Sequence, residues 1–326
     1  MGLMQEDHMR SIFTLFFLFQ LNLLLAQSQS EPPAIDRQEN KQIAVVVFVK
    51  GDVKIGNRRL KMGDKLINGE VIKTGDKATC DIQMTSSSSP IVIRIKEKSS
   101  FQLTETKQGN ETKISSVVES GKAFFNVSRL SSKEKMEVVT PTQTCGVRGT
   151  KFEMGVKSSG RERTLVTQGK VTTKPRLAKL EEIDSPLIKN LSTQESEVPS
   201  GSFVTLSKED SEEILNKAGL QEILDNPEDE KFSEKLDQAL KNTNFQNSLK
   251  NLNLSVQKLN EKALKKKTYT FEELIPIEPH LLERKGLLND FLTLRNKEKN
   301  MLSLIRKLEE ENEALKLELE SLKANK

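Results

Sequence analysis

The chain has 326 residues, with 51 lysines and arginines against 47 aspartates and glutamates, two histidines, two cysteines and no tryptophan. This length suits about two domains, and a hydrophobic share of only 35% favours one compact domain with polar helices over a single large core. The net charge of +4 is spread along the chain without a basic block, so no nucleic-acid partner is expected.

Residues 1–26 are predicted to be a signal peptide. The apolar run 12–26 is shorter than the roughly twenty residues of a membrane-spanning helix and has the length of a secretory signal. Because acidic residues follow Met1 closely, we expect the true start to be Met9, and cleavage is expected after Ala26. The alternative is an uncleaved anchor, and sequencing the N-terminus of the cell-extracted protein distinguishes the two.

Residues 27–42 are predicted to be a polar linker, and the chain beyond it is expected to be exported to the periplasm or cell envelope. No cysteine follows the apolar run, so a lipid-modified N-terminus is not expected.

Export permits a disulfide between Cys80 and Cys145, each on the apolar face of a strand. The alternative is two buried free thiols, and counting thiols with and without reductant decides between them.

Residues 43–206 are predicted to form a mainly β domain, either a sandwich or a solenoid-like stack. Short β-rich runs recur without helices between them, and many are separated by glycine beside an acid or another turn former. The predicted strands are 43–49, 53–55, 65–67, 71–74, 91–95, 100–103, 113–118, 122–127, 136–139, 152–156, 164–167 and 202–206. The acids lack the spacing of a calcium loop, so no metal is expected.

The most specific stretch is a corner between two of these strands. A β-branched run ends at Thr140 and Pro141, and proline has no N–H to donate to a sheet. Arg148 and Gly149 then break the backbone before Phe152 begins the next strand. The pattern predicts a fold element without a reaction centre. Arg148 could bind an anion, but an arginine after a corner more often bonds loop carbonyls or an acid, which the pattern favours.

Four groups of motifs support a resemblance: Gly-Asp or Gly-Glu turns at 63–64 and 69–70, Glu-Ser-Gly-Lys-Ala-Phe-Phe at 119–125, Val-Thr-Pro at 139–141 with Val-Arg-Gly-Thr-Lys-Phe at 147–152, and Gln-Gly-Lys-Val at 168–171. Together they resemble the FecR domain, the exported β domain named after the ferric-citrate sensory regulator. The family motif residues here are Thr140, Pro141, Val147, Arg148, Gly149, Thr150, Phe152 and Gly169.

The resemblance implies a role in sensing. In the regulator itself, a cytoplasmic segment controls a sigma factor, one helix crosses the inner membrane and the FecR domain senses an outer-membrane transporter. Only about ten residues precede the apolar run here, so we expect the domain to be reused in an exported protein that binds a protein or envelope ligand. The alternative is a membrane-anchored FecR-type sensor linked to transporter or iron status.

Residues 207–280 are predicted to be helical. A capping arrangement at Ser207 begins the first helix. Apolar residues from Leu249 to Ala263 step by three and four, which predicts one helix that ends at the lysines 265–267. These lysines are interpreted as a solvated last turn, with a lipid or polyanion patch as the alternative. A break between helices is expected at 269–280.

Residues 281–326 are predicted to be a coiled coil. Leucines or methionine recur every seven residues, and an asparagine interrupts otherwise mostly apolar positions between them. The d positions are Leu287, Leu294, Met301, Leu308, Leu315 and Leu322, and the a positions include Phe291, Ile305, Asn312 and Leu319. A single asparagine at an a position favours a parallel two-stranded coiled coil, so the expected partner is a second copy of the chain. The alternative is packing against another part of the same chain.

Catalytic chemistry has little support. Only His280 remains after export, two distant cysteines match no zinc spacing, and no phosphate-binding loop occurs. The sequence therefore predicts a protein that is not an enzyme and has no cofactor or metal. A hydrolase would need an acid pair in a cleft, which sequence alone does not locate.

Overall fold

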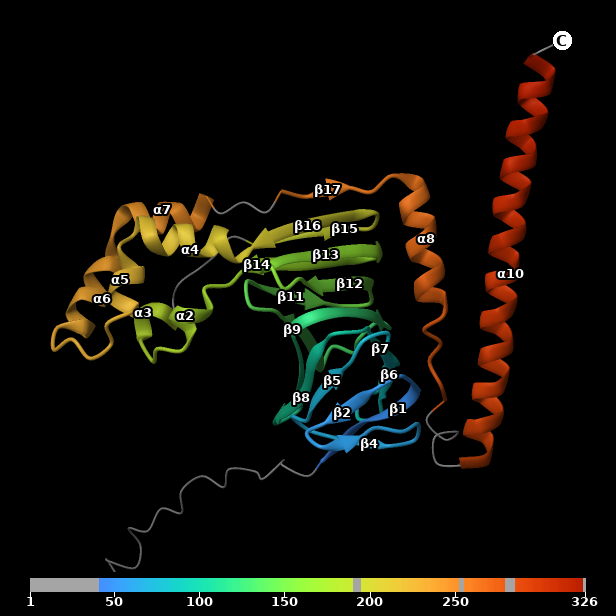
Figure 1. The fold of residues 1–326 in the computed structure, drawn as a ribbon. Helices are drawn as coiled ribbons and strands as arrows, with labels where there is room; N and C mark the ends of the chain where they lie inside the picture. Colours follow the sequence, from blue (N-terminus) through green and yellow to red (C-terminus); the bar gives the residue numbers. More distant parts are fainter. Residues whose placement is uncertain (1–40, 190–194, 252–254, 279–284, 325–326) are drawn as a thin grey trace, which may run out of the picture. The chain divides into compact units, whose positions relative to one another are not determined.

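A computed structural model describes residues 41–189, 195–251, 255–278 and 285–324 (Figure 1). The predicted signal peptide and nearly all of the predicted linker lie outside these residues. Strands dominate the described chain as far as Ser207, and helices follow. The predicted fold class, a mainly β N-terminal region followed by helices, is confirmed.

The strands form two sheets, here called sheet A and sheet B, that share one long strand. The order in sheet A is β4 (Lys65–Ile67), β1 (Gln42–Lys50), β6 (Thr79–Met84), β7 (Ile91–Ile95), β9 (Glu111–Val127), β12 (Lys151–Val156), β13 (Arg161–Gln168), β16 (Ser202–Ser207) and β17 (Gln257–Lys258). The order in sheet B is β3 (Arg58–Arg59), β2 (Val53–Ile55), β5 (Val71–Thr74), β8 (Ser100–Gln108), β9, β10 (Glu134–Val139), β11 (Gln143–Val147), β14 (Lys170–Pro175) and β15 (Ser196–Pro199).

Strand β9 passes from one sheet into the other. Its first part pairs with β8 and, in parallel, with β10, whereas residues 121–127 pair with β7 and β12. The change occurs near Gly121, whose φ is +83°. A Cβ atom there would lie 2.5 Å from the Cα atom of Ser99, so only glycine fits this position without a shift of the backbone.

Both sheets add strands almost in chain order, because the chain crosses from one sheet to the other and back as it advances. The fold therefore combines the two predicted alternatives: a sandwich of two sheets that is wound like a solenoid. Apolar side chains of both sheets fill the space between them. Phe125 and Phe152 stack there with centroids 4.7 Å apart, and Phe101 lies 6.4 Å from Phe125.

Most predicted strands are present, and the differences are local. The two strands expected at 113–118 and 122–127 are the single strand β9. The stretch 175–198, expected as an excursion from the sheets, holds the short helices α2 (Ala178–Glu181) and α3 (Pro186–Lys189) and the beginning of β15.

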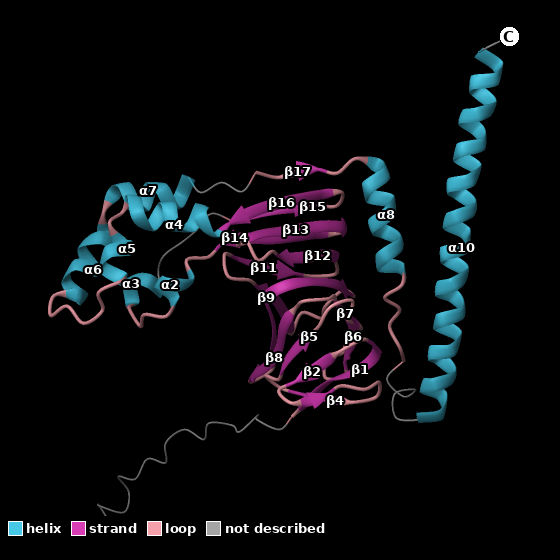
Figure 2. Cartoon of the chain, viewed as in Figure 1, coloured by secondary structure: helices cyan, strands magenta, loops and turns pink. Residues whose placement is uncertain are grey.

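A group of short helices follows β16 and has a small core of its own (Figure 2). These are α4 (Lys208–Lys217), α5 (Leu220–Leu224), α6 (Phe232–Lys241) and α7 (Thr243–Asn251). Ser207 and Asp210 form a reciprocal capping box at the start of α4, as the sequence predicts. The core contains Leu215, Leu220, Leu236, Leu240, Phe245 and Leu249, and Leu180 of the earlier helix α2 packs into it.

The prediction of one helix across Leu249–Ala263 is wrong. Helix α7 ends at Asn251, β17 pairs with β16, and α8 (Glu261–Glu272) begins after Asn260. The side chain of Asn260 accepts a hydrogen bond from the backbone of Ala263 at 2.8 Å, so the asparagine caps a new helix. The lysines 265–267 are therefore inside α8 and do not form a last turn.

Helix α10 (Lys285–Ala324) spans 40 residues, most of the predicted coiled-coil region. The expected break at 269–280 is correspondingly shorter, since α8 continues to Glu272.

Candidate binding face

The outward face of sheet A carries buried charged residues where a sheet surface would normally meet water. Side chains alternate along a strand, so β6 directs Cys80 into the core and Asp81 outward. The strand register aligns Asp81 with Arg94, Arg94 with Phe124, and Phe124 with Glu153 in one row across four strands. Asp81 is 0% exposed, Arg94 4% and Glu153 2%. Another part of the chain must therefore cover this row.

The cover is residues 255–278, here called the strap, which contain β17 and α8. Its strand β17 extends sheet A, with Gln257 opposite Phe203 of β16. Its side chains Phe271 and Leu274 are 1% exposed and form a small apolar cluster with residues of β7 and β9. Phe271 meets Phe124 edge to face, with ring centroids 5.4 Å apart.

Arg94 makes three charge-assisted hydrogen bonds, two within the sheet and one to the strap. Its Nε and one terminal nitrogen donate to the two carboxylate oxygens of Asp81, each at 2.8 Å. The other terminal nitrogen donates to Glu273 of the strap at 2.7 Å. Burial alone would lower the pKa of Arg94, but hydrogen bonds and charges from Asp81 and Glu273 raise it above its usual value, so the guanidinium is charged.

Two amide side chains of the sheet bind the backbone of the strap. Gln83 donates to the carbonyl oxygen of Ile277 at 2.5 Å and accepts from its N–H at 2.6 Å. Asn126 donates to the carbonyl oxygen of Leu274 at 2.7 Å. These bonds satisfy backbone groups of an irregular segment that has no sheet partner. Their partners are backbone atoms, so they do not depend on the side chains at those strap positions.

Glu153 is held between two lysines. Lys122 of β9 lies 3.4 Å from one of its oxygens, and Lys267 of the strap bonds the other. The ammonium of Lys267 also lies 5.3 Å from the ring centroid of Phe124. Lys267 therefore contacts the sheet, whereas the sequence suggested that the lysines 265–267 were solvated.

A cavity of about 490 Å³ opens on the same outward face, beside the beginning of the strap. The register places Lys122, Gly155 and Arg163 in one row across β9, β12 and β13. Gly155 has no side chain and leaves a hollow between the other two. Lys258 and its neighbours in the strap complete the wall.

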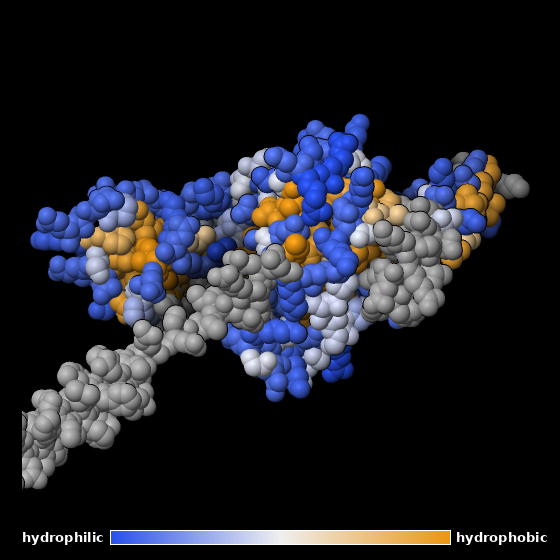
Figure 3. Space-filling view, turned by 90° about the horizontal axis from the view of Figure 1, so that it is seen from below, coloured by the Kyte–Doolittle hydropathy of each residue, from blue (hydrophilic) through white to orange (hydrophobic). Residues whose placement is uncertain are grey.

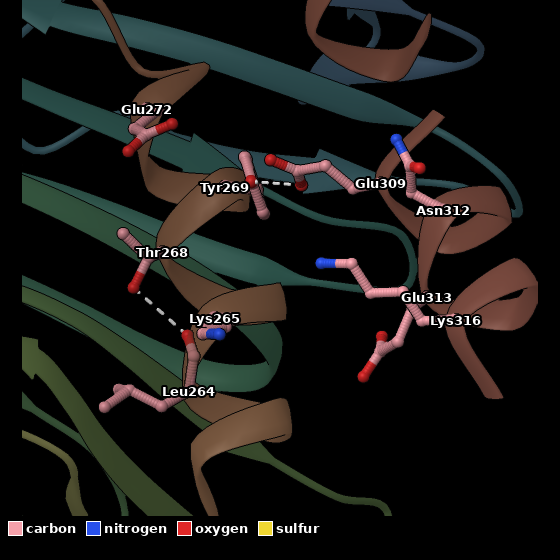
Figure 4. A pocket seen from close by; sticks show the side chains of 9 residues that line it. All are labelled: Leu264, Lys265, Thr268, Tyr269, Glu272, Glu309, Asn312, Glu313 and Lys316. Atoms are coloured by element: carbon pink, nitrogen blue, oxygen red, sulfur yellow. Dashed lines mark hydrogen bonds between the residues drawn. The ribbon is translucent and has the colours of Figure 1, made fainter. Parts of the chain in front are cut away.

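A second cavity of about 960 Å³ lies between residues of α8 and α10 (Figure 4). The hydroxyl of Tyr269 donates to Glu309 at 2.6 Å, and this bond raises the pKa of the tyrosine. Lysines and glutamates of both helices mix along the walls. Because the two signs of charge are interspersed, the cavity does not indicate one class of ligand.

The predicted motif residues build the corner of the fold. Thr140, directly after β10, donates to Glu162, whose other oxygen accepts from the backbone N–H of Thr142 at 3.1 Å. Arg176 donates to the carbonyl oxygen of Thr140 at 3.0 Å. Burial raises the pKa of Glu162, and these hydrogen bonds oppose the rise. Sequence reasoning missed Glu162, which lies in the inward-facing row of β13 and gave no motif signal.

The two motif glycines allow a close approach of two turns. Gly149 and Gly169 have φ values of +73° and +78°. A Cβ atom on Gly169 would lie 2.7 Å from the carbonyl oxygen of Gly149 and 2.9 Å from the Cγ2 atom of Thr150. Both positions therefore require glycine.

The other motif residues divide between core and surface. Val147, Thr150 and Phe152 are buried, whereas Pro141 and Arg148 are exposed. In the described part of the chain, no hydrogen bond or ion pair is recorded for the Arg148 side chain. The expected bond to loop carbonyls or an acid is therefore not present in this structure.

Cys80 and Cys145 are both free and buried. They lie in β6 of sheet A and β11 of sheet B, and Cys145 is close to Thr173, with 3.4 Å between the Sγ and Oγ1 atoms. Burial raises the pKa of the Cys145 thiol to about 11 and that of Cys80 further, so both are protonated at neutral pH. The structure contains the second of the two sequence alternatives, and thiol counting remains the measurement for the protein in solution.

The described residues form neither a metal-ligand cluster nor a membrane-spanning helix. No group of three or more histidine, cysteine, aspartate or glutamate side chains is placed to hold a metal ion there. Within the same ranges, no helix combines the length and apolar character that crossing a membrane requires.

Comparison with known proteins finds a family match within the β region. Residues 70–172 match the model of the family described as FecR protein, which confirms the resemblance inferred from the motifs. The matched stretch includes the motif residues of the corner. No curated protein matches the chain.

Two crystal structures, at 1.65 and 2.50 Å resolution, are similar to part of the chain. Both are of a candidate anti-sigma factor from Parabacteroides distasonis ATCC 8503. Each is 14% identical over 42% of this chain, with a TM-score of 0.31. The alignment covers 54% of the length of that protein, so the chain spans about half of it.

Proposed function

We propose that this chain is an exported, non-enzymatic regulatory protein whose FecR-type β domain binds a protein or envelope ligand and whose helix α10 joins two copies. The observation that carries the binding role is the outward face of sheet A. This face already holds a peptide segment, the strap, through apolar contacts, paired charges and backbone hydrogen bonds. The FecR match over residues 70–172 supports a regulatory role at the cell envelope.

The face has the composition of a protein-binding surface. Phe124 provides an aromatic anchor, Arg94 and Glu153 provide buried paired charges, and Gln83 and Asn126 bind backbone. Apolar anchors surrounded by satisfied polar groups are the usual source of affinity in such surfaces. A ligand with a segment similar to the strap would bind the same groups when the strap leaves.

A peptide experiment tests the face directly. A variant with Phe271→Ala and Leu274→Ala keeps the sheet but weakens its own strap. We expect a synthetic peptide of residues 255–278 to bind this variant in calorimetry and to bind the wild type at least tenfold more weakly. The same peptide with Phe271→Ala is the control and should not bind. Equal binding to wild type and variant, or no binding to either, would contradict the proposal.

Helix α10 supports the dimer. Its predicted seam residues are exposed, among them Ile305 at 43%, Leu308 at 53% and Leu315 at 62%, and Figure 3 shows apolar residues at the surface of the helix at the right of the view. An amphipathic helix gains most of its stability from packing of its apolar face. A second copy is the expected occupant, because the seven-residue spacing and Asn312 favour a parallel pair. The side chains of Leu287 and Phe291 lie outside the described ones.

Sedimentation equilibrium tests the dimer. We expect the wild type to be dimeric at micromolar concentration and Leu308→Glu to be monomeric, because the variant places charge in the seam. Lys307→Glu is the matched control, since Lys307 is exposed and adjacent but outside the seam, and it should remain dimeric. A monomeric wild type would remove self-association from the proposal and leave the binding role of sheet A standing.

A further inference from the structure

We propose that the cavity above Gly155 is a binding site for a small organic anion that carries carboxylate or phosphate groups. This inference goes beyond the proposed function and is independent of the dimer, because no residue of α10 lines the cavity. The floor is the backbone of β12 at Gly155. The neighbouring strands provide Lys122 and Arg163, and the strap provides Lys258.

The charge of the lining is strongly positive. Five lining side chains are cationic, and one, Glu153, is acidic. Glu153 is already neutralised by Lys122 and by Lys267 of the strap. The remaining cations are Lys157, Arg161, Arg163 and Lys258, and none of them forms an ion pair with another described residue. Unpaired cations that converge on one cavity favour an anionic ligand.

One acid outside the cavity, Glu209 at the start of α4, interacts with Arg161. The pKa of Glu209 is lowered first by hydrogen bonds from its own backbone and from Ser207, and Arg161 makes only a minor contribution. Glu209 therefore does not cancel the positive charge of the lining.

Arg163 is oriented for an oxyanion. Its guanidinium carbon lies 4.5 Å from the ring centroid of Phe203, so the flat face of the group is occupied. Its Nε atom is buried and has no hydrogen-bond partner among the described residues. A ligand in the cavity would therefore meet the terminal nitrogens of the guanidinium and not Nε. A guanidinium held by its face presents its edge, which matches the two oxygens of a carboxylate or phosphate.

The size of the cavity agrees with a small ligand. Its volume of about 490 Å³ falls within the roughly 300–1,000 Å³ that is usual for small-molecule sites. Phe203 and the aliphatic part of Lys122 add apolar surface for the carbon skeleton of an organic anion. An inorganic ion alone would contact only part of this lining.

Isothermal titration calorimetry with three probes tests the site: succinate as a dicarboxylate, pyrophosphate, and inorganic phosphate. At low ionic strength we expect the full chain to bind succinate or pyrophosphate with one site per chain and inorganic phosphate at least tenfold more weakly. The better of the first two probes identifies carboxylate or phosphate as the preferred group. Absence of binding by both would overturn the proposal.

Two variants locate the binding. Arg163→Gln should weaken it at least tenfold, because the oriented guanidinium is lost. Gly155→Val should weaken it similarly by filling the hollow without changing charge. A Cβ atom at position 155 meets the Cε atom of Lys122 at 3.7 Å, an ordinary contact, so the variant is expected to fold, as circular dichroism would show.

The matched control is Lys73→Gln, which removes one exposed cation from β5 of sheet B. It should change the affinity by less than twofold. If Gly155→Val binds as well as the wild type, or if Lys73→Gln weakens binding as much as Arg163→Gln, the anions bind through general surface charge and the proposal is wrong.

Discussion

The outward face of sheet A and the seam of helix α10 both carry apolar side chains, but the first is covered and the second is exposed. On sheet A, apolar and charged side chains that face outward are covered by the strap, and Asp81, Arg94 and Glu153 are buried. On α10, the described side chains of a regular apolar row are exposed, and Leu308 and Leu315 are more than half exposed. Within the described residues, the chain thus covers one surface by itself and leaves the other exposed.

If the proposed dimer forms, only the seam of α10 depends on assembly. Each charged group on sheet A has a specific partner, as the bidentate contact of Arg94 with Asp81 shows. The seam of α10 has no such individual pairs. It consists of a repeated apolar row, because every seventh residue is apolar. Loss of a partner inside the chain should therefore reduce the stability of the fold, whereas changes in α10 should alter association and leave the β domain intact.

The largest expected effect comes from breaking the buried ion pair. Asp81→Leu leaves Arg94 charged and paired only with the partly exposed Glu273, which should lower the free energy of unfolding by about 3–5 kcal/mol. The double variant Asp81→Leu with Arg94→Leu should recover much of the loss, since no unpaired charge remains. Urea unfolding measures both. A double variant less stable than the single one would show that the pair itself is the source of stability.

The next effect concerns the strap. Phe271→Ala removes a buried ring that packs on Phe124 and should cost about 3–5 kcal/mol of strap stability. Limited proteolysis should cleave this variant within 255–278 while the sheets stay intact. Lys266→Ala, at an exposed position of the same helix, should leave cleavage unchanged. Equal protection of both variants would mean that the strap is not held by this contact.

A smaller effect depends on pH. Although burial raises the pKa of Glu134, hydrogen bonds from Ser87, Ser88 and Ser131 lower it to about 2, below its usual value of 4.5. A lowered folded-state pKa stabilises the fold above the unfolded-state pKa, and this contribution is lost as pH falls from about 4.5 to about 2.

Glu134→Gln should therefore be less stable than the wild type by about 1 kcal/mol at pH 7, the scale of one or two hydrogen bonds. The difference should shrink as the pH falls through that window. Urea midpoints at pH 7, 4 and 2.5 check this, and a difference that stays constant with pH would contradict the assignment.

The smallest effect on the β domain is expected from Asn312→Leu. The substitution removes the polar position that specifies a two-stranded register and adds apolar surface to the seam. Sedimentation should show species larger than a dimer, while the free energy of unfolding of the β domain, measured in urea, stays within about 0.5 kcal/mol of the wild type. A strictly dimeric variant would show that Asn312 does not set the number of strands.

Local signals predicted much of the fold. The capping box at Ser207 and the strand alternation in β6 depend on residues close in sequence, and both are present. The helix expected across Leu249–Ala263 failed because β17 pairs with a strand more than 50 residues earlier, which outweighs a three-four apolar spacing. Apolar spacing alone does not show where one helix ends and a residue such as Asn260 caps the start of another.

The candidate binding face was harder to predict. Alternation places Asp81 and Gln83 outward, which normally means solvent. Gln83 instead binds Ile277, 194 residues away in the sequence, and no local pattern reports such a contact. The hollow at Gly155 has the same origin, since it depends on which side chains three strands place in one row.

The shared strand β9 has a mechanical consequence. Strands added in chain order can detach one at a time from either end, as in a repeat protein. Unfolding that begins at β4 or at β17 must proceed to β9 before the two sheets can separate. This is because β9 is hydrogen-bonded to strands of both sheets. Under tension, β9 should therefore be the last element to yield, and the amides of residues 121–127 should exchange with solvent hydrogen most slowly.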